Sequence, residues 1–189
     1  SDQAEVTGQE EVLKGLGAAA SRLRRSLGES LPTIQRFDTP VEQATTPSLE
    51  AQKMFNAGED VRARSSEYGS IPFFKRAIEL DPNFAMAYAR LASIYANLGQ
   101  GAEQRRNIEE AYARRERVSE RERFYIEGMH CGFSTDPDSC ANVYELWKRT
   151  YPRDGRPYGN LSSVYYGRDE CEKARGSGSE RETLLREVQ

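Results

Sequence analysis

The feature that most constrains the fold is a pattern that recurs about every 34 residues. In residues 87–100 (AYARLASIYANLGQ), two aromatic residues flank a leucine and a small residue at helical spacing. The corresponding sets along the chain are Met54, Ala57, Gly58, Val61; Tyr88, Leu91, Ala92, Tyr95; Phe124, Gly128, Cys131; and Tyr158, Leu161, Ser162, Tyr165. Because one helical hairpin cannot bury its apolar face alone, this period predicts a stack of antiparallel helix pairs.

Two prolines mark the joints between consecutive pairs. Asp81-Pro82 and Pro152 interrupt helical patterns, and proline suits the first turn of a helix but not its interior. Small residues such as Gly58 and Gly128 stand where the two helices of a pair approach each other. Ser119 and Glu122 are spaced as a capping box, which predicts a helix that begins just after Ser119.

A period of 34 residues with this packing pattern resembles the tetratricopeptide repeat family over residues 48–174. The resemblance implies an all-α fold, a right-handed superhelix of antiparallel helix pairs preceded by an extra N-terminal helix. The expected units are 48–84, 85–118, 119–154 and the partial unit 155–174. Glu127 and Trp147 depart from the pattern, since a leucine and an alanine are usual at these positions. We therefore expect atypical packing in the third repeat, residues 119–154.

The N-terminal third, residues 1–47, predicts a helix and an ordered connector. Val12, Leu13, Leu16, Ala20, Leu23 and Leu27 recur at spacings of three and four, and Gly28 would cap the C-terminus of this helix. The connector holds three prolines but too many apolar residues for a free linker. At its end, Thr46 is expected to be the N-cap of the next helix, with Pro47 at the first helical position.

This same segment resembles a region of bacterial membrane-anchored serine/threonine protein kinases. The stretches LGESL, QRFDTP and EQATTPSLEA carry the resemblance. It implies that the chain is a piece of a longer signalling protein, with residues 1–47 as the end of a preceding domain. It also implies that the parent is anchored in the bacterial inner membrane. The chain has no Gly-rich loop, His-Arg-Asp or Asp-Phe-Gly motif, so no kinase activity is expected of it.

The C-terminal tail, residues 175–189, departs from the repeat. Gly178 and Arg181 stand where a bulky and a small residue are expected, and Gly176 to Ser179 is typical of a flexible linker. The stretch ERETLLREVQ that follows predicts a short helix. Three interpretations stay open: a natural degenerate cap, a linker from an expression vector, or a tethered peptide.

The composition excludes some classes of protein. A net charge of −3, from 27 basic and 30 acidic residues, argues against a nucleic-acid partner. No apolar run approaches the ~20 residues that span a bilayer, so no membrane insertion is expected of this chain. Cys131, Cys140 and Cys171 show no metal-ligand spacing. We expect buried thiols in a reducing compartment, with a Cys131–Cys140 disulfide as the alternative.

No catalytic group, metal site or cofactor is predicted. His130 is the single histidine, so no histidine triad or pair of histidine ligands can form within the chain. The carboxylates are mixed with arginines, as in residues 112–124 (YARRERVSERERF), which is typical of a solvated helix end. The sequence therefore predicts a chain that is not an enzyme.

The remaining candidate site is the concave groove that first helices line in tetratricopeptide repeats. The repeat register assigns to it Asn56, Arg62, Arg90, Ser93, Asn97, Tyr125, Met129, Asn160, Ser163 and Tyr166, together with Glu59. Arginine, asparagine and tyrosine suit peptide backbones and carboxylates. The carboxylate clamp of chaperone-binding members is not expected, because Phe55, Glu59, Glu122 and Ile126 stand at its positions beside Arg90.

The leading hypothesis is a non-catalytic module that binds a protein or peptide segment in this groove. The alternative is a structural spacer or self-association module, with the N-terminal helix or the C-terminal tail at the contact and the tail docked as a helix. The two differ in oligomeric state and in the effect of substitutions in the groove.

Overall fold

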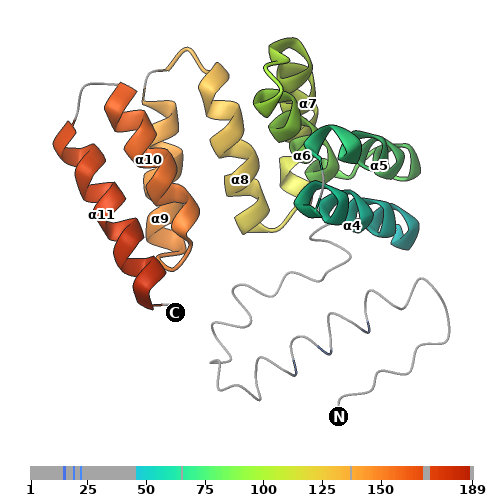
Figure 1. Cartoon of the computed structure of the whole chain (residues 1–189), viewed down its shortest axis with the longest axis horizontal. Coiled ribbons are helices and arrows are strands. Elements are labelled where there is room, and N and C mark those ends of the chain that lie inside the picture. Colours follow the sequence, from blue (N-terminus) through green and yellow to red (C-terminus); the bar gives the residue numbers. More distant parts are fainter. Residues whose placement is uncertain are drawn as a thin grey trace. The chain divides into compact units, whose positions relative to one another are not determined.

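A computed structural model describes residues 46–64, 66–136, 138–167 and 171–187, together with Gly15, Ala19 and Arg22 (Figure 1). Gly15, Ala19 and Arg22 are helical. The other residues up to 45, which include most of the helix and connector predicted for residues 1–47, lie outside the described residues. The described part of the chain consists of α-helices, short 3-10 helices and turns, without strands. The chain divides into two compact units, residues 1–126 and 127–189.

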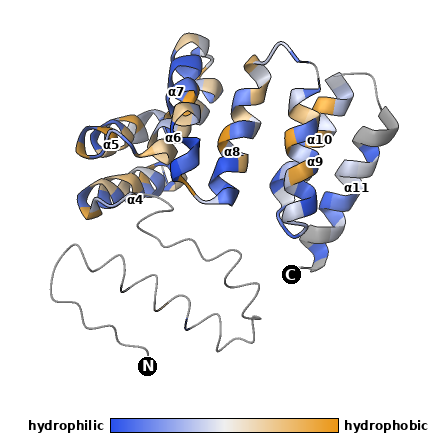
Figure 2. Cartoon of the chain, turned by 180° about the vertical axis from the view of Figure 1, so that it is seen from behind, coloured by the Kyte–Doolittle hydropathy of each residue, from blue (hydrophilic) through white to orange (hydrophobic). Residues whose placement is uncertain are grey.

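From residue 46 onward, the described part of the first unit holds two helical hairpins and the start of a third. Helices α4 (Leu49–Arg64) and α5 (Glu67–Leu80) form one pair. Helices α6 (Ala85–Asn97) and α7 (Gly101–Ala113) form the next, and α5 packs on α6. A 3-10 helix (Arg115–Arg117) leads to α8 (Glu120–His130), and the boundary between the two units falls within α8, after Ile126. In Figure 2 these helices carry both hydrophobic and hydrophilic residues, as a repeat that stacks through one face requires.

Local hydrogen bonds set the helix ends. The predicted capping box is confirmed: the Glu122 carboxylate accepts from the Ser119 backbone N–H at 3.0 Å, and the Ser119 hydroxyl accepts from the Glu122 N–H at 3.3 Å. The predicted cap at Thr46 is wrong. Ser48 caps α4 instead, since its hydroxyl accepts from the Ala51 N–H at 3.2 Å, and the Thr46 hydroxyl donates to the Asp81 carboxylate.

Phenylalanine rings and small residues form the core of the first unit. Phe55 contacts Phe74 and Phe84, with ring centroids 5.4 and 4.9 Å apart. Gly58 faces the same ring of Phe74, and a Cβ atom there would lie 2.9 Å from the ring. The small residue at this position therefore allows α4 and α5 to approach each other closely.

The second unit contains the rest of α8, a 3-10 helix (Cys131–Phe133), α9 (Ser139–Thr150), α10 (Gly155–Gly167) and α11 (Cys171–Glu187). Gly128 on α8 faces Tyr144 on α9, whose hydroxyl donates to the Gly128 carbonyl at 2.6 Å. Trp147 is fully buried and stacks on Tyr144, with centroids 6.3 Å apart. Helix α10 packs on both α9 and α11.

Two expectations for this unit are wrong. Cys131 and Cys140 are joined by a disulfide, with Cα atoms 5.0 Å apart, so they are not the free thiols that were expected. The hairpin turn between α8 and α9 brings them together. The tail is also not a Gly/Ser linker, because α11 runs through Gly176 to Ser179 without a break. Ser177 is 5% exposed, and Gly178 faces Ser162 on α10, so packing on α10 holds this stretch in a helix.

Candidate functional site

The candidate groove residues of α6 lie on the face opposite to its core. Arg90, Ser93 and Asn97 follow Tyr88, Leu91 and Tyr95 by two positions, and residues two apart in an α-helix project about 160° apart. Leu91 is fully buried, whereas Arg90 and Ser93 are half-buried and Asn97 is exposed. The repeat register therefore separates residues that pack from residues that face solvent.

Arg90 links α4, α6 and α8, which are the first helices of three successive helix pairs. Its Nε atom lies 2.9 Å from the Glu59 carboxylate on α4, and its NH1 atom donates to the Tyr125 hydroxyl on α8 at 3.0 Å. The guanidinium also lies 5.2 Å from the centre of the Tyr125 ring, within cation–π range. Nε and the Glu59 oxygen are buried but poorly aligned, so their attraction is ionic rather than a hydrogen bond.

A second cluster is centred on Glu67, which the repeat pattern does not indicate. The Glu67 carboxylate accepts from Arg62 Nε at 3.3 Å, and both of its oxygens lie 2.8 Å from Asn97 Nδ2. This residue opens α5 directly after the N-cap Ser66, which accounts for an acidic residue there without any role in a site. Its position at the start of α5, between Arg62 on α4 and Asn97 on α6, is visible only in the fold.

The remaining candidates of the first unit are simpler. Asn56 is exposed and accepts a hydrogen bond from Gln52 at 2.8 Å along α4. Phe55 and Ile126, two of the positions where chaperone-binding repeats carry a clamp, are 9% and 0% exposed. Their side chains belong to the core, so these two positions have no carboxylate clamp.

Electrostatics within the first unit balance the charge of Arg90. Burial raises the pKa of the Glu122 carboxyl above its ordinary value, while hydrogen bonds from Ser119 and the charge of Arg90 lower it in part. Arg90 therefore interacts with both Glu59 and Glu122. A ligand carboxylate would have to compete with these acidic residues, so this surface favours polar groups of a peptide over an isolated anion.

The candidates of the second unit lie mainly on α10. Asn160, Ser163 and Tyr166 are exposed at helical spacing, and Tyr166 is 56% exposed. The Ser163 hydroxyl donates to the Gly159 carbonyl at 3.3 Å. Met129 is half-buried on α8. Asn160, Ser163 and Tyr166 form a short polar and aromatic strip on α10.

The second unit also has an ionic cluster that the sequence did not indicate. Lys148 on α9 lies 3.5 Å from Glu145 and 3.2 Å from Glu180 on α11. Burial by itself lowers the pKa of Lys148, but the two carboxylates outweigh that effect and raise it. Glu145 also accepts from the Tyr165 hydroxyl at 3.0 Å. This cluster joins α9, α10 and α11.

Within the described residues, no group of histidine, cysteine and acidic side chains has the arrangement of a metal site. His130 is half-buried at the end of α8. No helix in the described part of the chain combines the length and apolar character needed to cross a bilayer.

Comparison with known proteins identifies the repeat. Residues 73–106 match the model of the tetratricopeptide repeat family, from the middle of α5 through α6 into α7. No curated protein matches the chain by sequence.

Solved structures with the same fold have low sequence identity. MamA residues 41 to the end from Desulfovibrio magneticus RS-1 align at a TM-score of 0.53 and 13% identity, covering 96% of this chain and 98% of that one. A crystal structure of MamA aligns at 0.52 and 16%, covering 98% of each. The Cut9–Hcn1 hetero-tetramer of APC/C aligns at 0.51 and 12%, covering 94% of this chain and 36% of that one. The predicted fold class is confirmed: the chain has the helical-repeat fold of the tetratricopeptide type, with a matched repeat at residues 73–106.

Proposed function

We propose that the chain is a non-catalytic interaction module that binds a peptide segment across the first helices α4, α6 and α8. The observation that carries the proposal is the cluster of Glu59, Arg90 and Tyr125. Side chains from three successive repeats meet there on a surface where Arg90 and Glu59 keep 21% and 32% of their side-chain area exposed. A surface already ordered by internal contacts loses little conformational entropy when a ligand binds.

The chemistry of this surface suits an extended polypeptide. Asn56, Ser93 and Asn97 supply amide and hydroxyl groups beside the two ionic clusters, and a peptide backbone needs both donors and acceptors. The family match supports an interaction role, and one structure of similar fold, Cut9–Hcn1, is a hetero-tetramer. We therefore place the peptide along the polar faces of α4 and α6.

The wider setting is a further part of the proposal. The resemblance of the N-terminal stretches LGESL and QRFDTP supports a parent of the bacterial serine/threonine kinase type. In such a parent the module would select partners or substrates for a kinase domain elsewhere in the protein. The complete reading frame tests this: a frame that encodes no kinase domain contradicts it.

A random-peptide display library selected on the whole chain tests the groove. Selected peptides are measured against the parent and against Arg90→Ala, and Asn160→Ala tests the separate strip on α10 of the second unit. We expect Arg90→Ala to weaken binding at least about tenfold, which is about 1.4 kcal/mol. Tyr125→Phe removes a single hydroxyl and gives a second variant that keeps the core intact. Arg105→Ala, an exposed arginine on α7, is the matched control.

Circular dichroism and sedimentation velocity accompany these measurements. If no selected peptide responds to Arg90→Ala or Tyr125→Phe in folded protein, the groove assignment is wrong. If none responds to Asn160→Ala, the strip on α10 is not a binding surface. If the chain instead sediments as an oligomer that these variants leave unchanged, the self-association alternative takes its place.

A further inference from the structure

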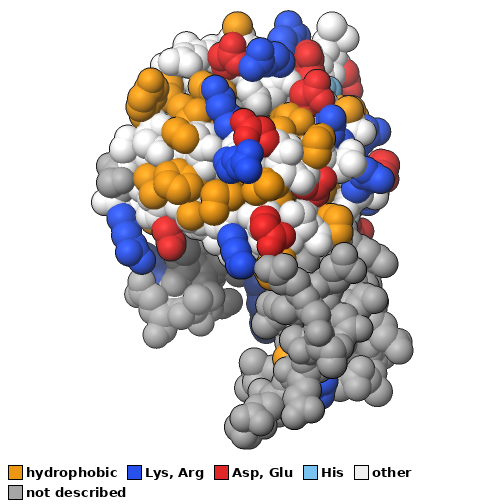
Figure 3. Space-filling view, turned by 90° about the vertical axis from the view of Figure 1, so that its right-hand side faces the viewer, with side chains coloured by type: hydrophobic (Ala, Val, Ile, Leu, Met, Phe, Trp, Pro, Cys, Tyr) orange, Lys and Arg blue, Asp and Glu red, His pale blue; other side chains and the backbone are white. Residues whose placement is uncertain are grey.

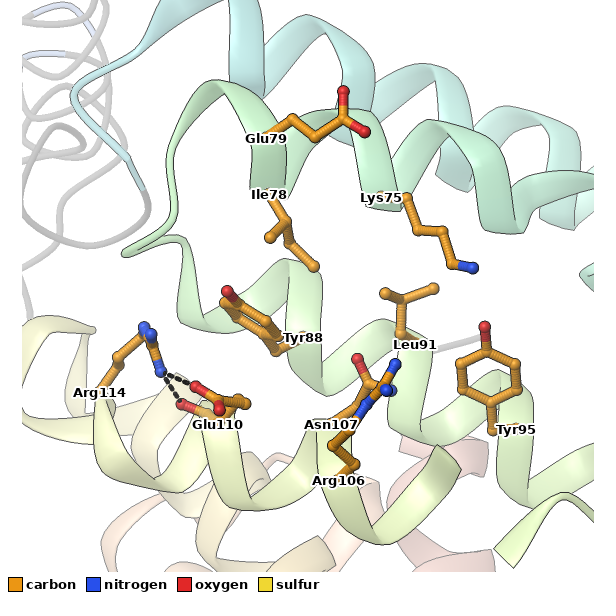
Figure 4. A pocket seen from close by; sticks show the side chains of 10 residues that line it. All are labelled: Lys75, Ile78, Glu79, Tyr88, Leu91, Tyr95, Arg106, Asn107, Glu110 and Arg114. Atoms are coloured by element: carbon orange, nitrogen blue, oxygen red, sulfur yellow. Dashed lines mark hydrogen bonds and ion pairs between the residues drawn. The ribbon is translucent and has the colours of Figure 1, made fainter. Parts of the chain in front are cut away.

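A second concave site lies on the other side of α6. A cavity of about 590 Å³ opens between α5 and α7, with α6 as its floor (Figure 4). Its α6 residues are Tyr88, Leu91 and Tyr95, on the helix face opposite to Arg90 and Asn97. The cavity is therefore separate from the proposed groove, and no feature of the repeat pattern indicates it as a binding site.

The floor of the cavity is aromatic and apolar. Leu91 lies at its centre, and Ile78 on α5 forms part of one wall (Figure 4). The pKa of Tyr88 is raised above its ordinary value, and burial is the largest cause. The phenol therefore stays neutral and can donate a hydrogen bond. Within the described part of the chain, the hydroxyls of Tyr88 and Tyr95 have no hydrogen-bond partner. The floor thus offers apolar contact area and two polar groups that are available to a ligand.

Most charges that line the cavity are neutralised within the protein. Arg114 pairs with Glu110, donates to the Pro82 carbonyl at 2.8 Å, and stacks over the Tyr88 ring at 4.8 Å. The Arg114 side chain is therefore held in place as part of the cavity wall, and its charge is already paired. At the rim, the Glu79 carboxylate lies 2.7 Å from Arg76. Figure 3 shows one face of the molecule, where side chains of both signs lie beside hydrophobic patches.

Lys75 is the exception among the lining charges. Arg106 lies 2.9 Å from Glu103, but Lys75 has no ion pair among the described residues. Figure 4 shows Lys75 reaching from α5 toward the end of the cavity where Tyr95 rises from α6. An ammonium group and a phenol hydroxyl at one end, next to apolar side chains, match a carboxylate attached to an apolar group.

We propose that this cavity is a second binding site, for a peptide segment that pairs an acidic residue with a large apolar one. The carboxylate binds Lys75 and the Tyr95 hydroxyl, and the apolar side chain packs on Ile78 and Tyr88, which are half-buried. Tyr88 to Tyr95 spans about 10 Å of helix, which is the length of about three residues of extended peptide. The cavity is open to solvent, which suits a continuous chain better than an enclosed small molecule.

The same random-peptide library tests the proposal, with binding measured by fluorescence polarisation. We expect a class of selected peptides with Asp or Glu next to an aromatic or aliphatic residue. Lys75→Glu should weaken their binding at least about tenfold, and Tyr95→Phe several-fold, because each removes one polar contact. Lys53→Glu makes the same change of charge on an exposed lysine of α4 and should leave their affinity unchanged.

The variants separate this proposal from the groove. Peptides of the cavity class should bind Arg90→Ala as well as the parent, and groove peptides should bind Lys75→Glu as well as the parent. The proposal is overturned if the library yields no peptide sensitive to Lys75→Glu in folded protein. It is also overturned if Lys53→Glu has an equal effect, since the change would then reflect net charge alone.

Discussion

Gly128 illustrates how one absent methyl group sets the distance between two helices. A Cβ atom at this position would lie 2.6 Å from the Tyr144 ring, closer than real Cβ contacts allow. The Tyr144 hydroxyl also donates to the Gly128 carbonyl, so the ring cannot move away without loss of that bond. Glycine is therefore required here by space rather than by backbone conformation.

Gly128→Ala should consequently destabilise the second unit by about 1–3 kcal/mol, the usual cost of overpacking. Gly101→Ala is the control, because no atom lies within 4 Å of its Cβ position and alanine favours helix. Urea unfolding followed by the fluorescence of Trp147, the single tryptophan, measures both. Equal midpoints for parent and Gly128→Ala would contradict the close approach of α8 and α9.

Residue types at packing positions were predictable, but polar partners were not. Gly58 and Gly128 follow from the repeat register, because close contact between helices recurs with the same period. Glu67 does not follow from it. Its contacts with Arg62 and Asn97 link residues 5 and 30 positions apart on three helices, and such contacts depend on how the helices pack.

Helix α11 shows that packing can outweigh composition over a whole element. Glycine costs about 1 kcal/mol relative to alanine inside a helix, so Gly176 and Gly178 favour a linker. Against this, Ser177 is buried, and Glu180 lies 3.2 Å from Lys148 on α9. Arg181 lies within 3.6 Å of the Cβ position of Gly159 on α10. These contacts stabilise the helix where propensity alone does not.

Ser179→Pro tests whether α11 is continuous. Proline in a helix interior costs about 3 kcal/mol or more, so this variant should lower the stability of the second unit. Ser179→Ala should leave it unchanged or slightly higher, because Ser179 is exposed. Trp147 fluorescence during urea unfolding reports both variants. A flexible linker at this position would make Ser179→Pro as stable as the parent.

At the scale of the whole molecule, each of the two units is stabilised by helices that pack on their sequence neighbours. In such arrays the total is close to a sum of local terms. The cysteines of the disulfide, Cys131 and Cys140, both lie in the second unit and close a loop across the α8–α9 turn. A cross-link there stabilises that unit directly.

Loss of this disulfide should lower the stability of the second unit by about 2–3 kcal/mol, from the entropy of a loop with a sequence separation of 9. The measurement is thermal unfolding by Trp147 fluorescence, with and without reductant. Reductant should lower the midpoint of the parent but not that of a Cys131→Ala/Cys140→Ala variant. Cys171→Ser is the control and should respond to reductant as the parent does.

The sequence by itself determined the repeat period, the helix pairs, the joints at Asp81-Pro82 and Pro152, and the Ser119–Glu122 cap. These features rest on local chemistry and on a periodicity that the successive sequence repeats share. The tertiary structure decided the disulfide, the course of α11, the Glu67 cluster and the cavity beside Lys75. Each of these depends on distances between residues of different helices, and such distances are set by packing rather than by spacing along the chain.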